Sequence, residues 1–311
     1  MNEEAGLAVL RALDALAYRF VPVTPETHKR VVARPGKSEA GDLRDVFGWS
    51  LPFEEPLLPP GLLAAMREGG LLESAGDGTW KSKVRASTVA DRLFLHSAFP
   101  TDADDSVFLG PDTVRFAAFL AAELRGAGPI RRLVDIGAGA GVGGIVAAAL
   151  VPGARIELVD VNEAAFPFAR ANAAHAGIDP AVHASDGVAA VAPGFDLAIA
   201  NPPFIIDEDG PAYRAGGDMH GAELSIDWAL AAADKLTPGG RMLLYSGSAI
   251  VDGRDALCEA LEAGLPERGC TLAYREIDPD IFGEELEKPS YRDVERIAAV
   301  GAVIVKGAGR G

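Results

Sequence analysis

Residues 133–144 read Leu133-Val134-Asp135-Ile136-Gly137-Ala138-Gly139-Ala140-Gly141-Val142-Gly143-Gly144. An apolar run ends at an acidic residue, breaks into alternating glycines and resumes as an alanine-rich segment that reaches Leu150. This order predicts a buried strand, a tight turn and the start of a helix. Glycines let the turn take positive φ and leave no Cβ between the backbone and a ligand. Because the first turn of a helix presents free N–H groups, we expect a polar ligand at this turn.

The glycine turn fits two cofactor patterns. Gly139-x-Gly141-x-x-Gly144 has the dinucleotide spacing, and Asp160 lies near the distance expected for an acid that binds a ribose. Asp135 followed by Gly137-x-Gly139-x-Gly141 is instead the pattern of S-adenosylmethionine-dependent methyltransferases. A glycine-rich turn that only connects a strand to a helix is the third interpretation. Residues downstream decide among the three.

Strand and helix patterns alternate from Ile130 onward, which is typical of an open, mostly parallel α/β sheet. The expected strands are 132–136, 155–160, 181–184, 195–200, 241–246, 271–277 and 298–306. The expected helices are 114–125, 142–150, 163–175, 221–236 and 252–265. We therefore predict that residues 107–311 form one α/β domain with a seven-stranded sheet and helices on both faces.

Residues 1–100 are predicted to form a separate, smaller and mostly helical domain. Apolar spacing and proline breaks predict helices at 7–20, 26–32, 41–49 and 62–68. Two short apolar stretches then flank Ala75-Gly76-Asp77-Gly78, which predicts a hairpin. Helices followed by a hairpin suggest a winged-helix-like module. The polar, turn-rich stretch 100–106 is the expected linker.

The second strand of this hairpin is expected to carry basic side chains. Lys81, Lys83 and Arg85 alternate with Trp80, Ser82 and Val84, so one face of the strand would be basic. Such a face is either simply solvated or contacts an acidic protein surface or RNA.

Composition and charge argue against some classes of partner and location for this protein. The formal net charge is −16, and residues 1–100 carry 12 Lys and Arg against 13 Asp and Glu, whereas residues 101–311 carry 17 against 32. An acidic C-terminal part argues against a long nucleic-acid duplex as partner, because such binding depends on neutralising phosphates. Only two cysteines occur, Cys258 and Cys270, which favours a reducing, cytoplasmic location. We expect no membrane span and no metal site, because no apolar run is long enough and no ligand cluster is evident.

Four polar features fall at the carboxyl ends of successive expected strands, where open α/β sheets bind their ligands. The first is the glycine turn with Asp135. Asp160 ends the second strand and can accept both ribose hydroxyls, while Val161 can cover an adenine face. Asp186 follows the third strand and can accept from an adenine amino group, or is only a turn residue. Asn201 follows the fourth strand.

The fourth feature, Asn201-Pro202-Pro203-Phe204, is the most specific. Two consecutive prolines fix φ and stiffen the backbone after Asn201. A rigid main-chain carbonyl and the Asn201 side-chain oxygen can then accept both hydrogens of a planar NH₂ group, and Phe204 offers an apolar face to a flat group. Holding both hydrogens aims the nitrogen lone pair at a methyl group, so positioning and fixed dipoles would supply the catalysis.

Together these motifs resemble those of class I S-adenosylmethionine-dependent methyltransferases of the amino-methylating branch. The segment Gly110-Pro111-Asp112-Thr113 is similar to the Arg-Pro-Asp-Thr-Glu segment of release-factor glutamine methyltransferases, which carry a small helical N-terminal domain that helps to dock the factor. Gly110 and Val114 stand where that family has arginine and glutamate, and Phe204 stands where tyrosine is usual. Phenylalanine at that position is equally familiar from ribosomal-RNA guanine-N2 methyltransferases.

The resemblance implies a Rossmann-like class I methyltransferase fold, S-adenosylmethionine as cofactor and a set of site residues. Cofactor contacts are implied for Asp135, Gly137, Ala138, Gly139, Gly141, Asp160, Val161, Asp186, Gly187 and Asn201. Catalytic roles are implied for Asn201, Pro202, Pro203 and Phe204. Acceptor contacts are expected at Phe108, Pro111, Thr113, Phe204 and Tyr213. Tyr213 and His220 lie in a loop that is either a substrate lid or simply solvated, and Glu284, Glu285, Glu287 and Tyr291 are expected to be solvated.

Three functions stay open at this point. The first is N-methylation of a protein glutamine side chain, with a release factor as the family's example. The second is N-methylation of an exocyclic amine of RNA or DNA (adenine N6 or guanine N2), or of a small molecule. The third is an NAD-binding oxidoreductase or a nucleotide sensor, which would give Asn201-Pro202-Pro203-Phe204 no role.

Overall fold

The computed structural model describes residues 1–206 and 216–308, and the chain forms two compact units. The N-terminal unit comprises residues 1–118, 139–145 and 162–180, and the sheet unit comprises residues 119–138, 146–161 and 181–311. The N-terminal unit thus extends past the predicted linker at 100–106 and takes in two later segments of chain. The separate roles assigned to residues 1–100 and 107–311 stay predictions.

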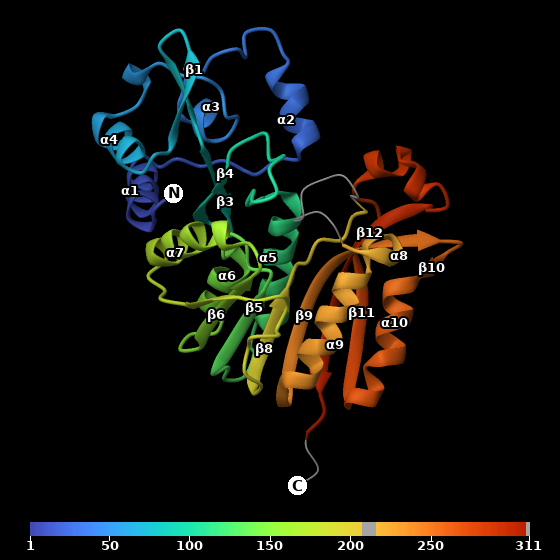
Figure 1. Ribbon diagram of the computed structural model, residues 1–311. Helices are drawn as coiled ribbons and strands as arrows, with labels where there is room; N and C mark the ends of the chain where they lie inside the picture. The colour runs from blue at the N-terminus through green and yellow to red at the C-terminus, as the bar shows by residue number, and fades with distance from the viewer. Residues whose placement is uncertain (207–215, 309–311) are drawn as a thin grey trace. The chain divides into compact units, whose positions relative to one another are not determined.

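The N-terminal unit begins with the four predicted helices (Figure 1). They are α1 (Glu3–Ala15), α2 (Pro25–Val32), α3 (Leu43–Phe47) and α4 (Pro60–Glu68), with a short 3₁₀ turn at Glu55–Leu57. Side chains cap three of them, because Asn2, Thr24 and Asp42 each accept a hydrogen bond from a backbone N–H of the first turn. Helix α1 packs against α4 and against α7 (Phe166–His175), and its inner face is fully buried.

Two hairpins follow these helices. The first joins β1 (Leu72–Gly76) to β2 (Thr79–Ser82) and confirms the predicted hairpin. The second joins β3 (Val84–Val89) to β4 (Arg92–Ser97) through Ala90 and Asp91, which both take positive φ. This second hairpin was not predicted, because a turn without glycine or proline carries little local signal in the sequence. Asn172 in α7 ties it to the unit by donating to Leu95 O and accepting from Leu95 N.

The predicted basic strand face is wrong. The strand breaks between Ser82 and Val84, and Arg85 is fully buried. Its guanidinium carbon lies 3.4 Å from the centroid of the Phe99 ring, and its Nε donates to Ser97 O. The cation and its π partner bury each other, a contact that alternation along a strand does not reveal. Burial and the Arg85 charge hold the pKa of His96, beside this guanidinium, well below its ordinary value.

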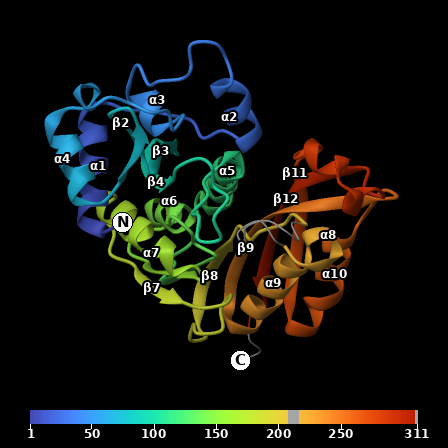
Figure 2. The same ribbon diagram turned by 45° about the horizontal axis from the view of Figure 1, so that its top comes forward.

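The sheet unit is built on one mixed sheet in the order β11-β12-β9-β8-β5-β6-β7. The strands are β5 (Arg132–Ile136), β6 (Arg155–Asp160), β7 (Ala181–Ala184), β8 (Phe195–Ala200), β9 (Leu236–Val251), β11 (Cys270–Asp278) and β12 (Arg296–Lys306), with the two-residue β10 (Arg254–Asp255) paired to β9. Neighbours from β7 to β9 pair in parallel, whereas β12 is antiparallel to both β9 and β11. The predicted seven-stranded, mostly parallel sheet is confirmed, and Figure 2 shows its strands side by side.

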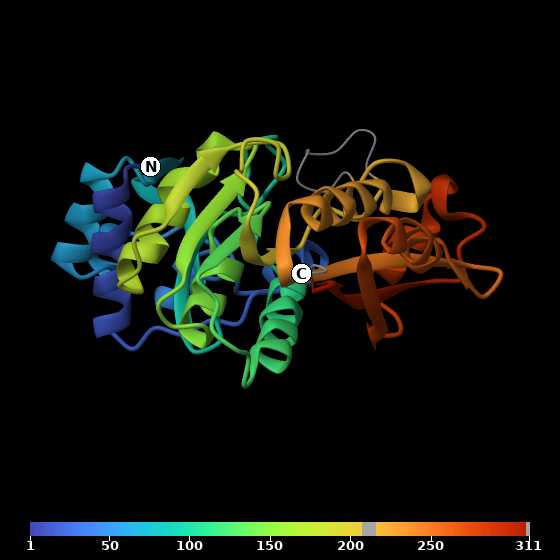
Figure 3. The same cartoon turned by 90° about the horizontal axis from the view of Figure 1, so that it is seen from below.

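Helices cover both faces of this sheet. Residues Ala298, Val300, Ala302 and Ile304 of β12 pack in one core with α9 (Glu223–Lys235) and α10 (Ala256–Gly264). The residues between them face the other way, where Gly301 lies against Phe119 of α5 (Pro111–Leu124). Figure 3 shows α9 and α5 on opposite sides of β9. Helix α5 and α6 (Val142–Leu150) each contribute residues to both units, and the smaller elements are Glu163–Ala165, α8 (Asp218–Gly221), Pro266–Arg268, Gly283–Glu287 and Pro289–Tyr291.

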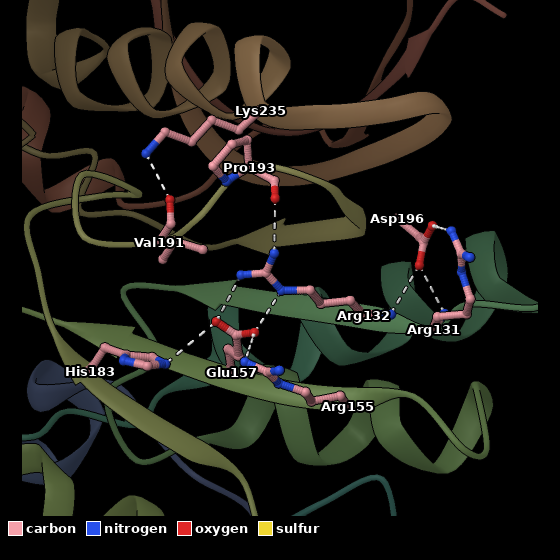
Figure 4. A network of polar contacts seen from close by, with 9 residues as sticks. All are labelled: Arg131, Arg132, Arg155, Glu157, His183, Val191, Pro193, Asp196 and Lys235. Carbon is pink, nitrogen blue, oxygen red and sulfur yellow. Dashed lines mark hydrogen bonds and ion pairs between the residues drawn. The ribbon is translucent and has the colours of Figure 1, made fainter.

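A polar network, rather than a helix, covers the sheet near the amino ends of β5 and β6 (Figure 4). The connection from β7 to β8 contains no helix. Glu157 is 2% exposed there, and Arg132 donates to its carboxylate from Nε at 2.6 Å and from a terminal nitrogen at 3.1 Å. Arg155 and His183 approach the same carboxylate at 3.0 and 3.4 Å. Burial raises the pKa of Glu157, but the bonds and charge of Arg132 outweigh it and keep this pKa below its ordinary value.

We expect Glu157→Gln to lower the free energy of unfolding by about 2–3 kcal/mol at pH 7. The substitution removes the negative charge of a charge-assisted pair and leaves the Arg132 guanidinium without an ionised partner at this position. Since the folded-state pKa is lowered, this stabilisation is complete above the unfolded carboxyl pKa and is lost as the pH falls through the folded value. Urea unfolding of the wild type and variant between pH 7 and pH 3 should show the difference shrinking in acid. The exposed Glu267→Gln serves as control, and a difference that is constant with pH would contradict the prediction.

Candidate active site

The carboxyl ends of β5, β6, β7 and β8 bring four predicted site residues to one edge of the sheet unit. Asp135 is the second-to-last residue of β5, Asp160 ends β6, Asp186 follows β7 and Asn201 follows β8. These strands are parallel and adjacent in the order β8-β5-β6-β7, so their carboxyl ends meet at the same edge. The sheet unit thus holds Asp135, Gly137, Ala138, Asp160, Val161, Asp186, Gly187, Asn201, Pro202, Pro203 and Phe204.

The remaining predicted residues lie elsewhere. Gly139 and Gly141 belong to the N-terminal unit and take positive φ of 52° and 79°. Phe108, Pro111 and Thr113 belong to the same unit, at the start of α5, where the Thr113 hydroxyl accepts from Gly110 N. Tyr213 lies outside the described residues. Acceptor contacts for these residues stay predictions.

The start of the glycine turn is held against β6. The backbone N–H groups of Gly137 and Ala138 both donate to Val159 O, at 2.8 and 2.9 Å. Gly137 takes a φ of +68°, and a Cβ built on it would lie 2.7 Å from the indole ring of Trp228. Glycine is therefore required here both for the backbone conformation and for the space beneath the turn.

The acidic residues at the strand ends differ in exposure. Asp135 is 2% exposed, whereas Asp160 is half-buried and Asp186 is exposed. Val161, directly after Asp160, is 64% exposed, which is unusual for a large apolar side chain. A carboxylate beside an exposed apolar side chain can bind a group that combines hydroxyls with a flat ring.

The side chain of Asn201 lies at a corner of the chain directly after β8. Its Oδ1 is buried and has no hydrogen-bond partner among the described residues. Buried polar atoms without partners are rare and call for an explanation, because desolvating them costs free energy. Pro202 and Pro203 follow directly and restrict the backbone. This oxygen can accept a hydrogen bond from a group that none of the described residues supplies.

Phe204 is more enclosed than expected. Its side chain is 8% exposed, and its ring meets Tyr245 and Phe282 edge-on with centroid separations of 6.5 and 5.8 Å. A Cβ on Gly247 would lie within 2.3 Å of this ring, so β9 is glycine there to make room. In this arrangement the ring offers little open face, and stacking of a flat acceptor on Phe204 stays a prediction.

The insertion between β11 and β12 also reaches this corner, and nothing in the sequence indicated this contact. Tyr291 is 1% exposed, and its hydroxyl accepts from Ile206 N at 2.7 Å. Asp293 Oδ1 lies 3.2 Å from Nε2 of His220, and His220 belongs to the segment that precedes α9. Glu285 is 4% exposed and paired with Lys288. The expectation that Glu285 and Tyr291 are solvated is therefore wrong. It was based on the acidic composition of the insertion, which does not show that one side of the insertion is buried.

A comparison with protein families matches the middle part of the chain. Residues 111–251 match the family model described as methyltransferase small domain. This part of the chain is a class I S-adenosylmethionine-dependent methyltransferase domain. The methyltransferase pattern of the glycine turn is thereby confirmed over the dinucleotide pattern.

The methyltransferase domain has relatives with two different acceptors. The chain is 46% identical over 74 residues to the ribosomal RNA small subunit methyltransferase C of Hahella chejuensis, covering 24% of this chain and 22% of the relative. It is 29% identical over 164 residues to the release factor glutamine methyltransferase of Deinococcus radiodurans, covering 50% and 55%. The chain thus spans at most about half the length of these relatives.

Solved structures support the fold alone. The crystal structure of a putative transferase from Pyrococcus horikoshii aligns with a TM-score of 0.50 at 13% identity, covering 79% of this chain and 83% of that one. The Rossmann-like fold predicted for the methyltransferase domain is confirmed. Within residues 1–206 and 216–308, no helix is long and apolar enough to cross a membrane. The same residues hold no group of three or more His, Cys, Asp or Glu side chains that could bind a metal.

Proposed function

We propose that this protein transfers a methyl group from S-adenosylmethionine to the side-chain amide nitrogen of a protein glutamine. The observation that carries the proposal is the buried Asn201 Oδ1, which has no hydrogen-bond partner within residues 1–206 and 216–308 and lies at a corner stiffened by two prolines. A primary amide is planar and has two hydrogens to donate, which matches an acceptor oxygen beside a rigid main-chain carbonyl.

The residues at the sheet edge fit the cofactor. In this proposal Asp160 accepts from the ribose hydroxyls, the exposed Val161 covers the base, and the turn at Gly137 receives the cofactor. Bound there, S-adenosylmethionine supplies an electrophilic methyl group. The cofactor contacts of Asp135, Ala138, Asp186 and Gly187 are proposed on the same grounds, since all lie at this edge.

The chain's own contribution is orientation and electrostatics. Asn201 Oδ1 and the Pro202 carbonyl accept the two amide hydrogens and so direct the nitrogen lone pair away from them. As the nitrogen gains positive charge, the same two oxygens stabilise it more strongly than they stabilise the neutral amide. The released proton passes to solvent.

Three observations favour a protein acceptor over a nucleic acid. Residues 101–311 carry 32 acidic against 17 basic side chains, which repels phosphates. The predicted basic strand, which was the local support for nucleic acid, loses Arg85 to the interior. The Phe204 ring is enclosed and presents little surface on which a base could stack.

An exocyclic base amine, guanine N2 above all, is the second candidate acceptor. The observation in its favour is the 46% identity, over 74 residues, to a ribosomal RNA methyltransferase. Such an amine is also planar with two hydrogens, so the corner at Asn201 would serve it in the same way.

Labelled-methyl transfer into a cell lysate separates the two acceptors. Purified protein and S-adenosylmethionine with a labelled methyl group are incubated with lysate, and the product is digested with protease or with nuclease. We expect protease-sensitive label and methylglutamine on hydrolysis. Nuclease-sensitive label would overturn the protein acceptor and favour the second candidate. Calorimetry with S-adenosylhomocysteine and with NAD checks the cofactor, and binding of NAD alone would reject the proposed chemistry.

A further inference from the structure

Trp228 lies beneath two turns of the proposed cofactor site. It belongs to α9, is 9% exposed and faces the sheet. A Cβ on Gly137 would lie 2.7 Å from Cη2 and Cζ3 of its six-membered ring. A Cβ on Gly187 would lie 3.0 Å from Cδ1 and 3.1 Å from Nε1 of its five-membered ring. Opposite ends of one indole thus contact the turns that follow β5 and β7.

These two turns are not adjacent in the sheet. Strand β6 separates β5 from β7, and each turn makes its backbone bonds to β6. Gly137 N donates to Val159 O, and Ser185 N donates to Asp160 O at 3.1 Å. The indole is long enough to contact both turns from below, so it links them directly. The backbone hydrogen bonds link the two turns only through β6, the strand between them.

The surroundings explain why a wide side chain is needed. The connection 185–194 contains no helix, so this part of the sheet face is covered by side chains from α9 and by Val188 and Val191. The indole N–H is buried and has no hydrogen-bond partner within residues 1–206 and 216–308. An unpaired buried N–H costs free energy. If this position served only to fill the core, an apolar side chain without that N–H would make the fold more stable.

We infer that Trp228 is a positioning residue for cofactor binding, one that holds the turns at Gly137 and at Asp186–Gly187 at the spacing that the adenosine part of the cofactor requires. This inference rests on the proposed function. It concerns affinity for the cofactor and leaves the methyl-accepting corner at Asn201 untouched.

The test compares Trp228→Phe with a matched core variant. Phenylalanine keeps the end of the side chain nearer α9 but cannot span both turns, so we expect the dissociation constant for S-adenosylhomocysteine to rise roughly tenfold. Leu261→Val, in the same core but on α10, should lower stability and leave that constant unchanged. Equal affinity in Trp228→Phe and wild type would overturn the inference, as would equal weakening by Leu261→Val.

Coupling to Gly137 is a second test. Gly137→Ala brings a Cβ against Cη2 and Cζ3 of the indole, atoms that phenylalanine lacks, so Trp228→Phe relieves that contact. The loss of affinity caused by Gly137→Ala should therefore be severalfold smaller in the Trp228→Phe background than in the wild type. Strictly multiplicative losses would show that the two residues act independently and would contradict the inference.

A spectroscopic measurement needs no variant at position 228. Protein labelled with 5-fluorotryptophan should give three resonances, from Trp49, Trp80 and Trp228, and Trp49→Phe and Trp80→Phe assign them by elimination. We expect S-adenosylhomocysteine to shift the Trp228 resonance. If the wild type binds and this resonance does not move, the inference fails. If the wild type binds no S-adenosylhomocysteine, the proposed function itself fails.

Discussion

Replacing Asn201 with alanine is expected to lower the rate of methyl transfer about 10²–10³-fold, which is the usual cost of removing one preorganised polar group that acts in the transition state. The affinity for S-adenosylhomocysteine should stay nearly the same, because in the proposed function the lost oxygen binds the acceptor amide. Alanine also removes a buried acceptor that has no partner in the described structure, so folding should be little impaired.

Single-turnover methylation and calorimetry measure the two quantities separately. Asn201→Asp is the companion variant, since a carboxylate keeps an oxygen at the same reach and should retain more activity than alanine. Unchanged turnover in Asn201→Ala would remove Asn201 from catalysis. A loss of cofactor affinity as large as the loss of rate would make it a binding residue instead.

Gly137→Ala is expected to weaken binding of S-adenosylhomocysteine by about 10²-fold, a change of about 2.8 kcal/mol. The alanine Cβ would disfavour the φ of +68° and lie 2.7 Å from the Trp228 ring, so the turn or the indole must move. Because Gly137 N and Ala138 N both donate to Val159 O, any movement displaces the turn that receives the cofactor.

Gly153→Ala is the matched control for this prediction. Gly153 also takes a positive φ, of +85°, but a Cβ there would meet no atom within 4 Å. It should cost about 1–2 kcal/mol of stability from the backbone conformation alone and leave the affinity unchanged. If Gly137→Ala bound S-adenosylhomocysteine like Gly153→Ala, the contact with Trp228 would have no part in shaping the turn. Calorimetry and urea unfolding supply both values.

Local patterns were sufficient for most of the methyltransferase domain. The predicted strands 132–136, 155–160, 181–184 and 195–200 coincide with β5, β6, β7 and β8. These strands are short apolar runs bounded by glycine, proline or acidic residues, so their ends are marked in the sequence itself. Since parallel strands align their carboxyl ends, the sequence also predicted that Asp135, Asp160, Asp186 and Asn201 share one edge.

Side-chain environment was predicted less well than backbone. Alternation placed Arg85 on an open strand face, but Phe99, 14 positions away, buries it. An acidic composition suggested that the β11–β12 insertion is solvated, yet Tyr291 turns inward to accept from Ile206 N. Both errors come from partners distant in sequence, which no local pattern contains.

Sequence by itself determined the order of strands and helices, the glycine turn, the acids at the strand ends and the stiff Asn201 corner, because each depends on residues that are neighbours along the chain. Only the tertiary structure decided that β12 lies between β9 and β11, that Trp228 spans the turns at Gly137 and Gly187, and that Phe204 is enclosed by Tyr245 and Phe282. The physical reason is that these contacts join residues tens of positions apart. Their formation depends on how the whole sheet closes its core, which is a property of the packed chain and of no single segment.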